Sequence, residues 1–215
     1  TGATTAVAVK YLSNSDAATV GIIGTGYQAP TQLEAVSKVR NIMSVKAFSR
    51  TAENRDAFAK SMSDSLGVAV SAASAAQEVV EGSDIVICIA AATEPVVKGE
   101  WLATGTTLIG AGPTTWRIRE VDDATLVRAD KLFVDSAEQV RDEAGDMASG
   151  VDRGLLQWSQ LLELRHAVAG TVTGRDNHNQ IIYAKMMGTG VADVAAAKLA
   201  YDKATEMGLG TEMEW

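Results

Sequence analysis

The chain has 215 residues, of which 47% are hydrophobic, and this is enough to bury the core of one large domain or of one domain with an appendage. Its formal net charge of -8 argues against a nucleic-acid surface, and its longest apolar run, residues 85–92, is far shorter than the ~20 residues that cross a bilayer. A single cysteine, Cys88, and two histidines argue against a disulfide framework and a multi-His metal site, so we expect a cytoplasmic protein without metal, membrane or nucleic-acid partners.

The first predicted element is a helix at the start of the chain. Apolar and small residues over 1–13 recur at helical spacing, and the polar residues 14–16 end the pattern. The chain opens at the edge of this helix and without an initiator Met. We therefore expect that a preceding segment is missing.

A glycine-rich turn follows the first predicted strand, residues 18–23. Gly24 favours the tight turn at the end of that strand, and Gly26 would let the backbone approach a pyrophosphate closely. Ala29 stands at the third small position of a G-x-G-x-x-G/A pattern, and the N–H groups of a helix that begins at about Gln28 would point at the anion. This spacing predicts a phosphate-binding loop, although ordinary glycine turns share it.

The residues on either side of the turn have the pattern of a βαβ unit. After the turn, apolar and small residues recur at helical spacing as far as about residue 40, and a second apolar run occupies residues 44–48. A strand, a glycine turn, a helix and a second strand in this order are typical of dinucleotide-binding folds. The context therefore favours a dinucleotide loop over an ordinary turn.

The second predicted strand ends in Ser49-Arg50-Thr51. Sites that prefer NAD usually place Asp or Glu here, to accept from the ribose hydroxyls, whereas hydroxyl groups and an arginine suit a 2′-phosphate. We therefore expect NADP(H) to be favoured, with NAD(H) possible. A charge-assisted contact from Arg50 is worth roughly 1.5–3 kcal/mol, a preference of about ten- to a hundredfold. The alternative is that Arg50 is a solvated loop charge.

Helices and strands continue to alternate up to about residue 134. The predicted helices are 53–66, 74–81 and a short stretch from residue 122, and the later strands are 68–70, 85–90, 106–110 and 131–134, which makes six strands in all. The continuous apolar run at 85–90 is typical of a parallel strand covered by helices on both faces. The loops at 91–95 and 111–115 have small residues that leave room for a dinucleotide, or they are ordinary polar turns.

The last third of the chain has weaker patterns. Residues 138–146 indicate an exposed charged helix, and residues 150–180 indicate short helices and loops, in which His166 and His178 favour structural or solvent-facing roles. Residues 191–206 form a strongly helical run. We therefore predict an α/β protein with a Rossmann-type doubly wound parallel sheet and a helical C-terminal segment. The NAD(P)-binding domain would span 1–150, with helix 1–13 as a connector, and the C-terminal segment 151–215.

Several motifs, in one order over nearly the whole chain, resemble the ornithine cyclodeaminase/mu-crystallin family. They are Thr1-Gly2-Ala3-Thr4-Thr5-Ala6, Gly24-Thr25-Gly26-Tyr27-Gln28-Ala29 with residues 31–35, Ser49-Arg50-Thr51, Gly99-Glu100-Trp101-Leu102, Val134-Asp135-Ser136, Glu143-Ala144-Gly145-Asp146, and Ala184-Lys185-Met186-Met187-Gly188 with residues 192–197. The resemblance implies a dinucleotide domain that binds NAD(H) or NADP(H) and exchanges hydride with the Cα of a small amino or imino acid. It carries the cofactor contacts onto Gly24, Thr25, Gly26, Tyr27, Gln28, Ala29, Ser49, Arg50, Thr51, Ala90, Ala91, Ala92, Ala111 and Gly112.

The resemblance also implies features that this chain lacks. Family members have an N-terminal segment that forms most of the substrate and dimer domain and supplies a catalytic Lys and a carboxylate-binding Arg; both would lie upstream of Thr1. The C-terminal segment would reach towards that domain. We therefore expect a homodimer when the protein is full length, and an isolated chain that holds cofactor without turnover.

Three functions remain open on this resemblance. True cyclodeaminases look to carry an Asp in the loop that matches residues 110–113, and none is present here. This favours an NAD(P)-dependent ketimine reductase or amino-acid dehydrogenase. The alternatives are a cyclodeaminase-type lyase that uses NAD catalytically and a mu-crystallin-like NADP-binding protein without turnover.

Overall fold

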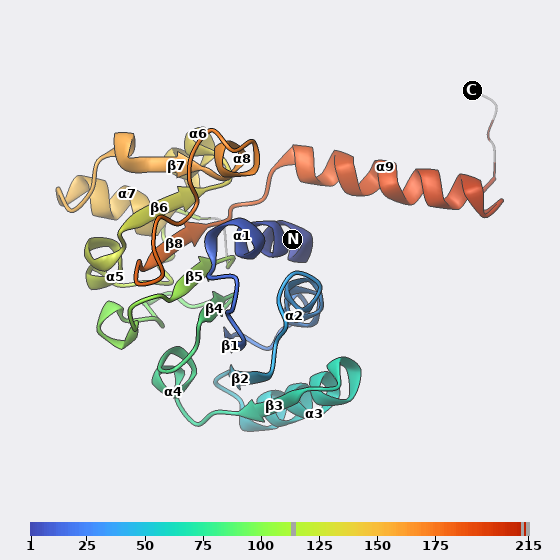
Figure 1. Cartoon of the computed structure of the whole chain (residues 1–215), viewed down its shortest axis with the longest axis horizontal. Helices are drawn as coiled ribbons and strands as arrows, with labels where there is room; N and C mark the ends of the chain where they lie inside the picture. Colours follow the sequence, from blue (N-terminus) through green and yellow to red (C-terminus); the bar gives the residue numbers. More distant parts are fainter. Residues whose placement is uncertain (113–114, 212, 214–215) are drawn as a thin grey trace.

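The computed structural model describes residues 1–112, 115–211 and 213, and its centre is an eight-stranded parallel sheet (Figure 1). The strand order is β3-β2-β1-β4-β5-β8-β6-β7. The chain runs outward from β1 to β3 and then crosses back to β4, which confirms the predicted doubly wound sheet. The strands are β1 Thr19–Ile23, β2 Ser44–Phe48, β3 Ala69–Ala72, β4 Ile85–Cys88, β5 Thr107–Gly110, β6 Lys131–Val134, β7 Leu161–Glu163 and β8 Ile182–Lys185.

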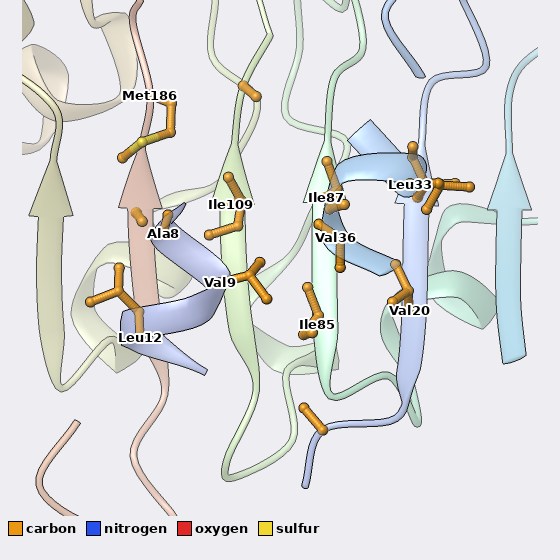
Figure 2. Close-up of a cluster of buried hydrophobic side chains, with 14 of the residues drawn as sticks. Ala8, Val9, Leu12, Val20, Leu33, Val36, Ile85, Ile87, Ile109 and Met186 are labelled. Atoms are coloured by element: carbon orange, nitrogen blue, oxygen red, sulfur yellow. The ribbon is translucent and has the colours of Figure 1, made fainter. Parts of the chain in front are cut away.

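Helices cover both faces of this sheet. They are α1 Gly2–Leu12, α2 Ala29–Ser37, α3 Ala52–Leu66, α4 Ala76–Val80, α5 Asp123–Arg128, α6 Ala137–Glu143, α7 Gly145–Asp152, α8 Leu164–Val168 and α9 Gly190–Glu206, with short 3-10 turns at Gly99–Trp101 and Trp158–Gln160. Side chains of α1, α2, α3 and α8 form one core cluster, and those of α4, α5, α6 and α7 form the other. Figure 2 shows the first cluster, in which α1 and α2 pack over the central strands.

Strand β4 shows why both faces are apolar. Ile85 and Ile87 belong to the first core cluster, while Val86 and Cys88 belong to the second, and all four are fully buried. Successive side chains of a strand point to opposite faces, so a strand between two helical layers must be apolar at every position. Cys88 is therefore a core residue of this strand.

Two strands differ from the sequence prediction. Residues 150–180 were expected to form short helices and loops, but β7 lies at the edge of the sheet, and β8, outside the six predicted strands, lies between β5 and β6. These strands have three and four residues, and their pairing partners are far away in the sequence, so the local pattern gave too little signal. Both come from the range 151–215, and the domain boundary at residue 150 stays a prediction.

The helix predicted at 191–206 is confirmed as α9, which projects away from the sheet and its covering helices (Figure 1). None of its residues is buried. Within the described residues, no helix is both long and apolar enough to cross a membrane. Pro113 and Thr114, which belong to a predicted loop, lie outside the described residues.

Asp84 ties the start of β4 to the start of β1. Its Oδ2 accepts hydrogen bonds from the backbone N–H groups of Ala18 and Thr19, both at 2.9 Å, and from Thr19 Oγ1 at 2.7 Å. Partial burial raises the pKa of Asp84, but these hydrogen bonds together lower it by a larger amount. The pKa of Asp84 therefore lies below its ordinary value. The ionised carboxylate therefore holds the two central strands in register.

We expect Asp84→Ala to lower the free energy of unfolding by about 1–2 kcal/mol at pH 7. Three buried charged hydrogen bonds would contribute more, but these are weakened because the site is exposed to solvent. Since the folded pKa is depressed, the stabilisation is present above the ordinary aspartate value and is lost as the pH falls through the folded pKa. Urea unfolding at pH 7 and pH 3 should show the difference from wild type shrinking at the lower pH. Asp64→Ala on the exposed face of α3 is the control, with an expected change within about 0.5 kcal/mol.

Candidate functional site

The carboxyl ends of β1, β4, β5 and β8 border a cavity of about 340 Å³, which we call the strand-end cavity. In an open α/β sheet, ligands bind at this edge, beside the point where the strand order reverses. The cavity is lined by Thr1, Thr4, Gln28, Ile89, Ala91, Ala111, Gly112, Met186, Met187 and Gly188. None of these side chains is ionisable, so its walls are apolar or weakly polar.

The glycine turn lies beside this cavity. Gly24 has a φ of +104°, and a Cβ there would lie 2.5 Å from the Ile89 carbonyl oxygen, so glycine is required by both conformation and space. A Cβ on Gly26, in contrast, would meet nothing within 4 Å. The N–H of Ala29 donates to the Gly26 carbonyl, but those of residues 25–28 have no acceptor among the described residues. Gly26 therefore faces open space next to a set of free backbone donors.

The end of β2 lies on the other side of the glycine turn. Thr25 Oγ1 donates to Ser49 Oγ at 2.9 Å, which joins the turn to this strand end. Arg50 is exposed. A second arginine, Arg55, donates to the Ser49 carbonyl at 3.1 Å and lies over the Phe48 ring at 5.8 Å. The sequence analysis missed Arg55 because it lies inside the following helix.

The structure distributes the predicted cofactor residues over three places. Gln28, Ala91, Ala111 and Gly112 line the strand-end cavity. Gly24, Thr25 and Gly26 form the turn, and Ser49, Arg50 and Thr51 follow β2, outside the cavity. In sheets of this kind, dinucleotides bind across the switch point, and the adenosine ribose lies near the end of the second strand.

The remaining predicted residues take other positions. Tyr27 is 95% exposed and does not line the cavity. Ala29 is fully buried in the first core cluster, where its small side chain lets α2 lie close to the sheet. Ala90 is half-buried and packs against the second core cluster, and Ala92 is half-buried beside it in sequence.

The sequence analysis missed the contribution of the chain after β8 to the cavity. Met186 continues the ladder by donating to the Gly110 carbonyl at 2.8 Å, and Met187 and Gly188 follow it along the cavity wall. Figure 2 shows Met186 at the arrowhead end of its strand. Because β8 was not predicted as a strand, no pattern in the sequence indicated that these residues lie beside β5.

The comparisons with known proteins agree with this architecture. The model of the ornithine cyclodeaminase/mu-crystallin family matches residues 1–208. The chain belongs to this family.

Three relatives illustrate the range of this ornithine cyclodeaminase/mu-crystallin family. Delta(1)-pyrroline-2-carboxylate reductase of Bacillus cereus is 34% identical over 216 residues, which cover 100% of this chain and 66% of the relative. The structure of the Thermococcus litoralis enzyme of the same name, in complex with NADH and L-proline, superposes with a TM-score of 0.95 at 41% identity and covers 99% and 66% of the two chains. An archaeal alanine dehydrogenase dimer with bound NAD gives a TM-score of 0.92 at 29% identity, covering 100% and 66%. The chain thus spans 66% of the length of these relatives.

Beneath the cavity, this family member holds a buried ion cluster of Glu120, Asp146 and Lys185. Lys185 Nζ lies 2.8 Å from Glu120 Oε2 and 3.5 Å from Asp146 Oδ2, and both carboxylates are fully buried. Glu120 Oε2 also accepts from the N–H of Gly112, at 3.1 Å. The cluster therefore ties β8 to the loop that lines the cavity after β5.

The cluster corrects the prediction of an exposed charged helix at 138–146 for one residue: Asp146 is fully buried and accepts from Tyr183 Oη at 3.3 Å, whereas Glu138 and Asp142 are exposed as expected. Burial raises the pKa of the neighbouring Cys88 thiol well above its ordinary range, and the Glu120 carboxylate raises it further. This thiol stays protonated, which agrees with a core role and not with a nucleophile.

Within the described part of the chain, no group of three or more His, Cys, Asp or Glu residues could hold a metal ion.

Proposed function

We propose that this chain binds NAD(P)H, with the pyrophosphate on the glycine turn, the adenosine at the end of β2 and the nicotinamide in the strand-end cavity. The observation that carries the proposal is the position of the turn, between the exposed hydroxyl- and arginine-bearing strand end and the apolar cavity. The relatives named above, with bound NADH and NAD in two solved structures, support it.

The residues present fit a dinucleotide. The free N–H groups of residues 25–28 offer donors to an anion, and Gly26 leaves open the space that a pyrophosphate needs. On the cavity side, Ala91, Ala111 and Gly112 have the small side chains that allow a planar ring to enter. Any larger side chain at Gly112 would collide with Glu120, since a Cβ there would lie 2.1 Å from Oε1.

We infer that the whole protein is an oxidoreductase that acts on the C=N or C–N bond of a small imino or amino acid, as the names of its relatives suggest. When bound, the cofactor supplies or accepts the hydride. The chain's own part is to position the ring and to exclude water with the apolar wall of Ile89, Met186 and Met187. Groups that bind the substrate carboxylate and move a proton are expected in the part of the relatives that this chain does not match, so we propose that the 215-residue chain alone binds cofactor without turnover.

The activity is tested with a protein that has the full length of the relatives. The absorbance of NAD(P)H is followed with Δ1-pyrroline-2-carboxylate or another small cyclic imino acid as the substrate. The expected result is consumption of NAD(P)H in proportion to the amine formed. Release of ammonia from ornithine with no net change in NAD(P)H would contradict the reductase and support a cyclodeaminase. Binding without turnover of any imino or amino acid would support the binding protein. Sedimentation of the same protein tests the proposed homodimer.

We propose NADP(H) as the favoured cofactor, and Arg50→Ala tests this. We expect the variant to bind NADPH about tenfold more weakly, the lower end for a charge-assisted contact because Arg50 is exposed, and to bind NADH within about twofold of wild type. Quenching of tryptophan fluorescence on titration gives both dissociation constants. Lys60→Ala, which removes one exposed charge further along α3, is the control for net charge and should change neither value. Equal losses for both nucleotides would contradict a 2′-phosphate contact.

A further inference from the structure

Asp135, at the end of β6, holds the backbone that follows β8. Its Oδ2 accepts hydrogen bonds from the N–H groups of Met187 at 2.8 Å and Gly188 at 2.7 Å, while its Oδ1 accepts from the N–H of Ser136 at 3.0 Å. Sheet pairing of this segment ends with Met186, which donates to Gly110 of β5. Past that point, the Asp135 carboxylate replaces the neighbouring strand as the acceptor for two successive N–H groups.

The two residues that Asp135 holds line the strand-end cavity. Gly188 has a φ of +89°, so the chain turns sharply here before α9 begins at Gly190. A turn of this kind has several alternative conformations unless its N–H groups have fixed acceptors, and charge-assisted hydrogen bonds are the strongest available. One half-buried carboxylate therefore sets the shape of one wall of the cavity.

We propose that Asp135 is a positioning residue for the nicotinamide half of the cofactor. It does not line the cavity itself but fixes the Met187–Gly188 backbone against which the ring would lie. The proposal rests on the proposed function, because it assigns the nicotinamide to this cavity. Its specific consequence is that Asp135 affects the nicotinamide end of the ligand and leaves the adenosine end, at β2, unaffected.

The chain contains a matched control at the opposite end of the same strand. Asp130 Oδ2 accepts from the N–H of Ile181 at 2.7 Å, just before β8 begins. It is the same kind of contact, from an aspartate next to β6 to the backbone next to β8. This contact lies at the amino ends of the two strands, whereas the cavity lies at the carboxyl ends. Loss of Asp130 therefore reproduces the loss of a strand-end carboxylate without changing the cavity wall.

The test compares two probes, NADH and ADP-ribose, which share the adenosine and pyrophosphate and differ in the nicotinamide. In the 215-residue chain, Asp135→Ala is expected to weaken NADH binding about tenfold or more while ADP-ribose stays within about twofold. Asp130→Ala should leave the ratio of the two dissociation constants unchanged. Asp135→Asn keeps one acceptor oxygen and should recover part of the NADH affinity, and it also serves if the alanine variant does not fold.

The possible outcomes separate this inference from the proposed function. If Asp135→Ala weakens both probes equally or neither, or if Asp130→Ala gives the same selective loss, the positioning role is wrong and the nucleotide site stands. A wild-type chain that binds NADH no more tightly than ADP-ribose also overturns it, because the cavity then does not hold the nicotinamide. If wild type binds neither probe, the proposed function fails, and this inference fails with it.

Discussion

Replacing Lys185 with methionine is expected to lower the free energy of unfolding by about 3–5 kcal/mol, the usual cost of removing one partner from a buried ion pair. Only 2% of the Lys185 side chain is exposed, and Glu120 and Asp146 have no exposed side-chain surface. Without the ammonium group, two carboxylates would face each other in the core with no counter-charge. Since whole domains are stable by about 5–15 kcal/mol, this single change could remove much of the total.

Urea unfolding of Lys185→Met against wild type measures this effect. The control is Lys198→Met in α9, where the lysine also pairs with an aspartate, Asp202, but 72% of its side chain is exposed; we expect a change within about 0.5 kcal/mol. Burial lowers the pKa of Lys185, but the two carboxylates outweigh it, so the pKa lies above the ordinary lysine value. The stabilisation is therefore complete below about pH 10 and is lost as the pH rises through the folded pKa. A destabilisation below about 1 kcal/mol would show that the cluster is not essential.

Gly24→Ala is expected to abolish nucleotide binding and to lower the free energy of unfolding by about 2–4 kcal/mol, because the new Cβ adds left-handed backbone strain to a steric clash. The clash is with backbone, the Ile89 carbonyl oxygen at 2.5 Å, so no side-chain rotation relieves it. Moving Ile89 would in turn displace the cavity wall after β4. Thermal unfolding and NADPH titration of the same sample measure both losses.

Two other glycines separate the contributions at Gly24. Gly67, which ends α3, has a φ of +68° but no atom within 4 Å of a Cβ, so Gly67→Ala should show only the strain, about 1–2 kcal/mol, with normal nucleotide binding. Gly26→Ala should leave stability within about 0.5 kcal/mol of wild type, since a Cβ there meets open space, yet weaken NADPH binding strongly. Normal NADPH binding by Gly26→Ala would contradict the pyrophosphate position.

The features that the sequence predicted correctly are those with local signals. The strand, glycine turn and helix around Gly24 lie within one short stretch, and the apolar run of β4 indicates by itself a strand covered on both faces. The arginine at the end of β2 could be placed because the βαβ pattern fixes where that strand ends. The cofactor contacts of these residues remain predictions.

The features that the sequence analysis missed depend on residues far apart in the chain. Lys185 lies 65 positions from Glu120, and Tyr183 lies 37 positions from Asp146, so no local pattern distinguishes these charges from solvated ones. The predicted helix that ends at Asp146 looked exposed because most of residues 138–143 are charged or polar. In the same way, Asp135 gave no sign of its contact with Gly188, 53 positions later. Only the insertion of β8 between β5 and β6 brings these pairs together.

That insertion also determines the order in which the sheet can be assembled. Strands β1 to β5 pair in one continuous series, β3-β2-β1-β4-β5, without any later strand, so this part of the sheet can form as soon as it is synthesised. Strands β6 and β7 pair with each other but reach β5 only through β8, the last strand among the described residues. Until residues 182–185 are available, β5 and β6 each present an open edge of unpaired N–H and C=O groups, a known template for aggregation. A polypeptide cut short before Ile182 would keep both of these edges unpaired, so β8 is the strand that closes the interior of the sheet against edge-to-edge aggregation.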